Sequence, residues 1–154
     1  MMNEQNRTDE AEKIIRKYMW GAVAAGAVPA PLLDIALITG IQLQLVRSLA
    51  WRYDVPFSEQ LGPSVISVLV GGSLPVLSSG MLKFLPGVGF LFGLVGVPII
   101  AGASTYAVGR VFIQHFESGG TFLTFDPQKV RGYYAEQFST GKEEITRNYT
   151  GIKP

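Results

Sequence analysis

The stretch Phe84–Gly109, FLPGVGFLFGLVGVPIIAGASTYAVG, contains no charged residue. A second uncharged stretch, Gln60–Leu82, QLGPSVISVLVGGSLPVLSSGML, comes directly before it, and Lys83 alone separates the two. About 20 apolar residues in a helix cross the ~30 Å hydrocarbon core of a bilayer, so each stretch is long enough to span one. Residues typical of a tight turn follow Lys83, namely Pro86, Gly87 and Gly89. The pair of stretches therefore predicts a helical hairpin in a membrane.

The composition agrees with this interpretation. Only 16% of the 154 residues are charged and 47% are hydrophobic, whereas about a quarter of the residues in a typical soluble domain are charged. A chain of this length predicts one domain. The net charge of +1, without a basic block, argues against a nucleic-acid partner. The absence of cysteine excludes disulfides, thiolate metal sites and cysteine nucleophiles.

An earlier stretch, Val28–Ala36, VPAPLLDIA, places two prolines and a carboxylate inside an apolar run. Pro29 is expected to end one helix, and Pro31 is expected to occupy the first turn of the next. Asp34 then falls in that first turn, where unpaired N–H groups and the helix dipole favour an anion. A first helical hairpin is therefore expected to precede the uncharged one.

The expected fold is all-α, with two helical hairpins at about residues 9–53 and 61–116. The second hairpin is expected to be transmembrane or deeply membrane-inserted. A short amphipathic helix follows, starting at Asp126-Pro127 and ending near Ser139.

This layout predicts one helical membrane-associated domain, residues 9–139, between polar tails at 1–8 and 140–154. Of the 13 Lys and Arg residues, all but Lys83 fall on one side of the two hairpins. The positive-inside rule then places both termini in the cytoplasm, at a bacterial inner membrane or its organellar equivalent.

Small residues at helical spacing occur in both uncharged stretches. Gly89 and Gly93 are four residues apart, as are Ser67 and Gly71, and Ala103 and Ala107. Such pairs let helices approach closely where lipid gives no hydrophobic drive for association. We therefore expect Gly71, Gly93, Ala103 and Ala107 to pack helices together.

No pattern predicts catalysis, a cofactor or a metal. The segment Gly87–Gly93 resembles a dinucleotide-binding loop, but its last glycine is one residue late and no acidic residue follows at the required distance. His115 is the only histidine, so one chain cannot build a multi-histidine metal site. We expect His115 to lie at a helix end.

Asp34 and Lys83 are the ionisable residues of the two predicted turns. Such groups are costly at membrane depth and often functional there. If the hairpins pack side by side, Lys83 is a possible partner for Asp34. The alternative is that Asp34 only stabilises a helix start and that Lys83 reaches the membrane surface.

Several short motifs carry a resemblance to a known family: Pro29–Asp34, PAPLLD; Leu85–Gly89, LPGVG; Gly109–Phe112, GRVF; and Phe116–Gly119, FESG. Over roughly residues 10–120 the chain resembles the YcjF-type domain of unknown function of bacterial inner-membrane and chloroplast-lineage proteins. That domain is often fused to, or encoded beside, Era-like or dynamin-like GTPase domains. The resemblance implies no catalytic residues. Because this chain has no GTPase domain, it implies a GTPase partner in trans.

Three functions follow as hypotheses. The first is a non-enzymatic membrane module whose partners are the lipid bilayer and a GTPase. The second is an oligomeric transport or pore-forming protein, with polar residues of the uncharged stretches inside the membrane, namely Ser67, Ser73, Ser78, Ser79, Ser104 and Thr105. The third is an amphitropic helical bundle that hides the second hairpin in its core until it meets a membrane.

Overall fold

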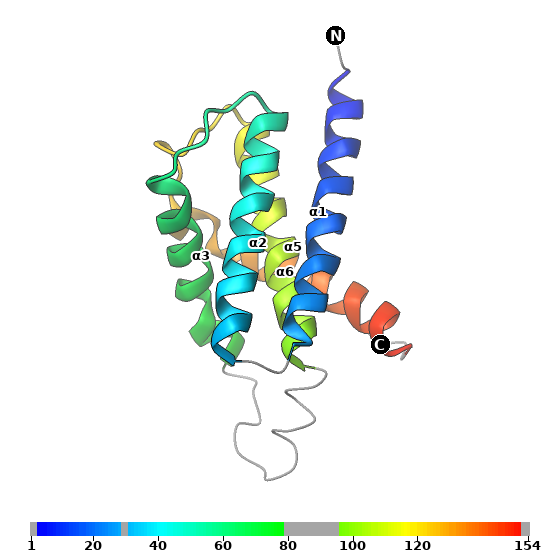
Figure 1. Ribbon diagram of the computed structural model, residues 1–154. Coiled ribbons are helices and arrows are strands. Elements are labelled where there is room, and N and C mark those ends of the chain that lie inside the picture. The colour runs from blue at the N-terminus through cyan, green and yellow to red at the C-terminus, as the bar shows by residue number, and fades with distance from the viewer. Residues whose placement is uncertain (1–2, 29–30, 79–95, 152–154) are drawn as a thin grey trace.

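Helices account for all regular structure in the part of the chain that the computed structural model describes, residues 3–28, 31–78 and 96–151. The helices are α1 (Glu4–Gly26), α2 (Pro31–Arg52), α3 (Leu61–Ser78), α5 (Val97–Glu117) and α6 (Pro127–Thr150). Helices α1, α2 and α3 lie side by side, α5 lies behind them, and α6 crosses the back of the bundle (Figure 1). The all-α prediction is therefore confirmed.

Helix α1 begins earlier than the sequence predicts. Its first residue is Glu4, so residues 4–8 are helical and not a loose tail. Thr8 lies inside the helix, where its Oγ1 donates to the Glu4 carbonyl oxygen (3.2 Å) and to Glu117 Oε1 on α5 (2.9 Å). This contact with α5 is the physical reason why the polar N-terminal turn is ordered.

Helix α5 is the central helix, in contact with α1, α2, α3 and α6. Nearly every residue from Pro98 to Phe116 is buried. Two glycines allow α1 to approach it closely. A Cβ on Gly102 would lie 2.5 Å from Val23 Cγ2, and a Cβ on Gly109 would lie 2.7 Å from Ile15 Cγ1. The uncharged sequence of α5 is thus the core of the bundle.

The second predicted hairpin is only partly confirmed. Its helices α3 and α5 exist, but α5 packs mainly against α1 and α6, and α3 packs mainly against α6. Among the helices of the described ranges, none is both long and apolar enough to cross a membrane. The transmembrane hairpin therefore has no support from these helices.

The C-terminal helix is longer than predicted. Asp126 caps it as expected, because its side chain accepts a hydrogen bond from the backbone N–H of Gln128 (3.0 Å). The helix then continues past Ser139 to Thr150, through most of the predicted polar tail. Gly141 and Ile145 are buried against α5, and this contact orders the segment in spite of its charged residues.

A cluster of aromatic residues joins the end of α5 to the loop before α6. Phe112 stacks on Phe125 with ring centroids 4.8 Å apart, and Phe122 meets Phe57 edge-on at 5.3 Å. Gly119, with φ 83°, ends α5 in the left-handed conformation that glycine adopts without strain. The cluster fixes the loop against the core.

Candidate functional site

Charged side chains gather at one end of the bundle. We call this the charged end and define it as residues 4–17 of α1, 43–52 of α2, 110–117 of α5 and the loops at 53–60 and 118–126. Three ion pairs bind α1 to its neighbours, namely Glu10 with Arg52 of α2, Glu12 with Arg110 of α5, and Arg16 with Glu144 of α6. These pairs fix α1 at this end.

Glu117 collects two further contacts at the charged end. Its Oε1 accepts hydrogen bonds from Thr8 Oγ1 (2.9 Å) and from the hydroxyl of Tyr53 (2.8 Å). Burial, together with the Glu117 carboxylate, raises the pKa of Tyr53 above its usual value. Tyr53 therefore stays protonated and acts as a hydrogen-bond donor, not as a base.

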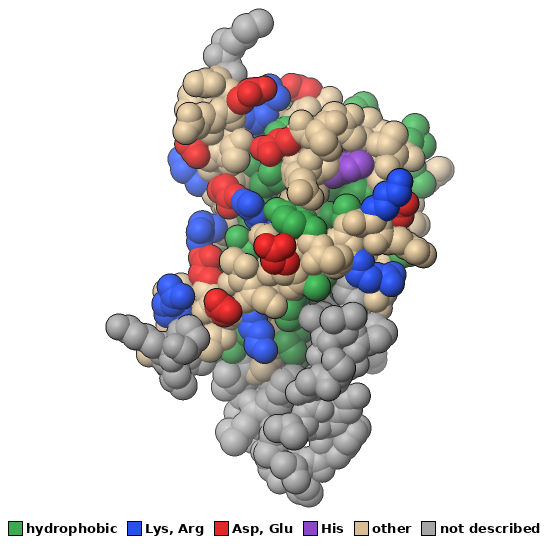
Figure 2. Space-filling view, turned by 180° about the vertical axis from the view of Figure 1, so that it is seen from behind, with side chains coloured by type: hydrophobic (Ala, Val, Ile, Leu, Met, Phe, Trp, Pro, Cys, Tyr) green, Lys and Arg blue, Asp and Glu red, His purple; other side chains and the backbone are tan. Residues whose placement is uncertain are grey.

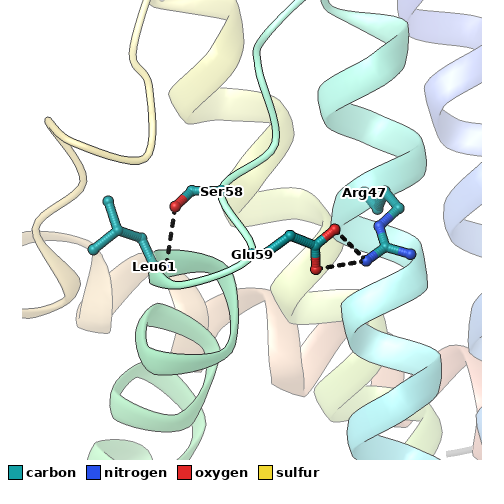
Figure 3. A network of polar contacts seen from close by, with 4 residues as sticks. All are labelled: Arg47, Ser58, Glu59 and Leu61. Atoms are coloured by element: carbon teal, nitrogen blue, oxygen red, sulfur yellow. Dashed lines mark hydrogen bonds and ion pairs between the residues drawn. The ribbon is translucent and has the colours of Figure 1, made fainter.

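The loop between α2 and α3 is held by a small polar network (Figure 3). Both carboxylate oxygens of Glu59 accept from Arg47 Nη2, at 2.8 and 2.9 Å, and the Arg47 guanidinium lies 4.9 Å from the ring centroid of Phe57. Ser58 Oγ accepts from the backbone N–H of Leu61 at the start of α3 (3.1 Å). Ser58 thus caps the helix that leads away from the charged end.

A buried polar network joins α2, α5 and α6. Gln42 Nε2 donates to Ser104 Oγ (3.1 Å) and more weakly to Thr105 Oγ1 (3.4 Å), and Ser104 shares a hydrogen bond of 2.8 Å with the Tyr134 hydroxyl. Burial raises the pKa of Tyr134 to about 12. The network contains no carboxylate, histidine or lysine, so it has no general base to activate Ser104. It serves to hold three helices together.

His115 lies near the end of α5, as the sequence predicts. Its Nε2 is 2.8 Å from the carbonyl oxygen of Thr121, and its ring meets Phe125 edge-on at 4.9 Å. Within the described residues, no group of three or more histidine, cysteine or acidic side chains is arranged to hold a metal ion. His115 therefore fixes the loop after α5.

The opposite end of the bundle has a different surface. We call it the apolar end and define it as residues 20–28 of α1, 31–41 of α2, 70–78 of α3 and 97–102 of α5. Asp34 is its one charged residue, and the Asp34 side chain lies outside the described part of the structure. Large apolar side chains are exposed here, including Val28 (40%) and Leu37 (46%). Exposed apolar side chains on helices that carry so few charges are typical of an interaction with lipid or with another apolar surface.

Comparison with known proteins places this architecture in a family. A family model described as a domain of unknown function, DUF697, matches residues 2–143. The chain belongs to this family. Because the match covers α1 to α5 and most of α6, the helices described above are those of a DUF697 domain.

This DUF697 chain is also similar to a protein named magnetosome membrane protein 22 from Magnetospirillum gryphiswaldense. The two are 44% identical over 137 residues, which covers 86% of this chain and 70% of the relative. No solved structure matches the chain. Membership of a family of unknown function is thus confirmed, while the YcjF-type resemblance and the GTPase partner stay predictions.

Most of the turn residues predicted for this DUF697 chain lie outside the described residues. Pro31 and Asp34 belong to the first turn of α2, although their side chains are not described. The other predicted turn and packing residues outside the described ranges are Pro29, Lys83, Pro86, Gly87, Gly89 and Gly93. Pairing of Asp34 with Lys83 therefore stays a prediction.

The remaining packing residues fall in contrasting places. Ala103 and Ala107 are fully buried on α5. Gly71, on α3, is exposed, and no described atom lies within 4 Å of the position that a Cβ would occupy. Sequence reasoning missed Gly102 and Gly109 as the close contacts with α1, although both lie in the uncharged stretch whose small residues were singled out.

Proposed function

We propose that this protein is a non-enzymatic membrane-associated module that inserts its apolar end into a bilayer and leaves its charged end in water. The observation that carries the proposal is the separation of charge along the bundle. Between Lys17 of α1 and Arg47 of α2 the only charged residue is Asp34, and α3 has none. The name of the relative from Magnetospirillum, a membrane protein, supports the same setting.

The burial of α5 supports a particular form of this function. Inside the bundle, Ser104 is hydrogen-bonded to Gln42 and Tyr134. Thr105 is hydrogen-bonded to Gln42 and to the Ala101 carbonyl oxygen. They therefore do not line a path through the protein, and no described contact supports the pore-forming alternative. An amphitropic bundle, folded before it meets the membrane, is the second candidate that α5 favours, because its uncharged sequence is already covered by other helices.

The charged end is the surface that we propose for a partner in the aqueous phase. Trp51, at the end of α2, is 80% exposed beside Arg52, and Leu123 is exposed in the loop after α5. Tryptophan is enriched among the residues that contribute most to binding at protein interfaces. The YcjF-type resemblance makes a GTPase supplied in trans the first partner to test, with both termini on the cytoplasmic side.

The membrane proposal predicts different effects of one substitution at the two ends. Leu37→Asp puts a charge on the apolar end, so we expect most of the protein to leave the membrane fraction of cells that express the full chain. Leu123→Asp is the matched control. It makes the same change at a side chain of the charged end that is 86% exposed, and we expect no loss of membrane association.

Three results would decide between the candidates. If both variants leave the membrane fraction, or if neither does, insertion of the apolar end is contradicted. Resistance of the wild-type protein to alkaline carbonate supports stable insertion. Recovery of folded wild-type protein without detergent, followed by binding to added vesicles, supports the amphitropic form.

A further inference from the structure

Helix α6 crosses the bundle between its two ends. Near its middle, Gly141 lies against Tyr106 of α5, because a Cβ there would be 2.9 Å from Tyr106 Cδ1. Ile145 is fully buried beside Gly102, with its Cδ1 2.6 Å from the position of a Cβ on that glycine. The helix therefore has one edge turned to the charged end and one edge turned to the apolar end.

Two contacts identify these edges. Glu144 pairs with Arg16, which lies on the charged end of α1. Arg131 lies against α3 at Gly72, in the apolar end, with Nη2 2.6 Å from the position of a Cβ. A helix repeats every 3.6 residues, so residues eleven apart share an edge. Lys142 therefore shares the edge of Arg131, opposite that of Glu144.

The edge facing the apolar end is basic. The same periodicity assigns to it Gln128, Arg131, Ala135, Phe138, Lys142, Thr146 and Tyr149, and none of these is acidic. Phe138 is buried, so it lies where this edge meets the core. Arg131 and Lys142 have no ion-pair partner among the described residues, whereas Arg16, Arg52 and Arg110 of the bundle are paired. Figure 2 shows Lys and Arg side chains near the lower border of the face that α6 covers, with an acidic side chain among them.

Cations that have no ion-pair partner among the described residues, next to exposed apolar side chains, match the chemistry of a bilayer that contains anionic lipid. The apolar stem of Arg or Lys follows apolar surface while its charged group reaches the headgroup layer. An exposed tyrosine such as Tyr149 also favours that layer. Arginine in addition binds a phosphate with two parallel hydrogen bonds.

We propose that this edge of α6 binds the phosphate headgroups of anionic lipids through Arg131 and Lys142. The inference rests on the proposed insertion of the apolar end and adds a preference for lipid charge. Helix α6 then lies at the bilayer surface and sets the depth to which the apolar end enters.

The test uses the purified full-length chain and two kinds of vesicle. One contains phosphatidylcholine alone, and the other contains about one third phosphatidylglycerol. We expect the wild-type protein to bind both, and the anionic vesicles more tightly. The double variant Arg131→Gln/Lys142→Gln should bind anionic vesicles roughly tenfold more weakly and neutral vesicles unchanged.

The matched control removes the same charge from the outward face of the same helix. Lys129 and Arg147 are exposed, and they lie eighteen residues, or five turns, apart on that face. We expect Lys129→Gln/Arg147→Gln to keep most of the preference for anionic vesicles. The exchange Arg131→Lys/Lys142→Arg, which preserves both charges, should also keep it, and circular dichroism should show the same helix content for all variants.

Several outcomes separate this inference from the proposed function. Equal wild-type binding to neutral and anionic vesicles overturns the headgroup site while leaving apolar insertion in place. Equal weakening by the two double glutamine variants overturns it as well, because binding then depends only on net charge. Binding to neither kind of vesicle contradicts the proposed function itself.

Discussion

The two ends of the bundle are held together by different forces. At the charged end, ion pairs such as Glu12 with Arg110 and a cluster of phenylalanines join the helices. At the apolar end, close backbone approach replaces charge, because a Cβ on Gly26 would lie 2.9 Å from Pro98 Cα. Ion pairs depend on how their charges are solvated, whereas close packing of small residues also operates in lipid. This difference is what the proposed position of the chain, with one end in water and the other in a membrane, requires.

The largest expected effect comes from disturbing the close approach of α1 and α5. Gly102→Val puts side-chain atoms into space that Val23 and Ile145 occupy, so we expect the free energy of unfolding to fall by about 3 kcal/mol. Urea denaturation followed by circular dichroism measures it. Gly21→Ala is the control, because nothing lies within 4 Å of its Cβ position and alanine favours a helix by about 0.5–1 kcal/mol. A mild effect of Gly102→Val would mean that the apolar end is loosely packed.

An intermediate effect is expected where the two ends meet, at Tyr134. Tyr134→Phe removes the hydrogen bond with Ser104 and should cost about 1 kcal/mol at neutral pH. At alkaline pH the difference reverses, and Tyr134→Phe becomes the more stable of the two proteins. The pKa of this tyrosine is 10.0 without burial and about 12 in the folded protein, so its protonated form favours the folded state below pH 10.

Between pH 10 and pH 12 the unfolded chain loses this proton and the folded protein keeps it. The wild-type protein should therefore lose about 2 to 3 kcal/mol that Tyr134→Phe does not lose. Urea denaturation at several pH values compares the two proteins. A difference in stability that stays constant through this range would show that Tyr134 is not buried in the network.

The smallest effect is expected at the surface of the charged end. Arg47 and Glu59 form a well-aligned pair, but their side chains are 40% and 72% exposed. Exposed pairs contribute little, so Glu59→Gln should change the free energy of unfolding by less than about 0.5 kcal/mol. A fall in the free energy of unfolding above about 1 kcal/mol at low salt would mean that this loop stabilises the charged end more than an exposed ion pair should.

Local signals in the sequence predicted the starts of α2 and α6, but not that of α1. Pro31 begins α2, and Asp126 caps α6 ahead of Pro127, because proline and short polar side chains act on the backbone next to them. The end of α6 could not be predicted in this way. By local rules, Gly141 and the charged segment after it predict a polar tail. The segment is helical instead, because Gly141 packs against Tyr106 of α5, and local rules do not include that contact.

Local sequence signals also could not predict that the uncharged stretch of α5 lies in the core of the bundle. A helix that is apolar on all sides suits both a membrane and the interior of a bundle. The partners of α5, such as Ile15, Leu45 and Tyr134, are distant in sequence, and periodicity does not say which helices meet. For the same reason the link between Gln42 and Ser104 was not foreseen, although both residues were visible as polar positions in apolar helices.

One measurement tests the central claim, that the apolar end contacts lipid while the charged end remains in water. The chain has no cysteine, so single substitutions provide unique labelling sites. Val28→Cys and Leu37→Cys report on the apolar end, and Leu123→Cys reports on the charged end. Each variant is treated with a membrane-impermeant maleimide before and after binding to vesicles. We predict that binding protects the first two thiols and leaves the third reactive. Equal reactivity of all three thiols on vesicles would contradict the account.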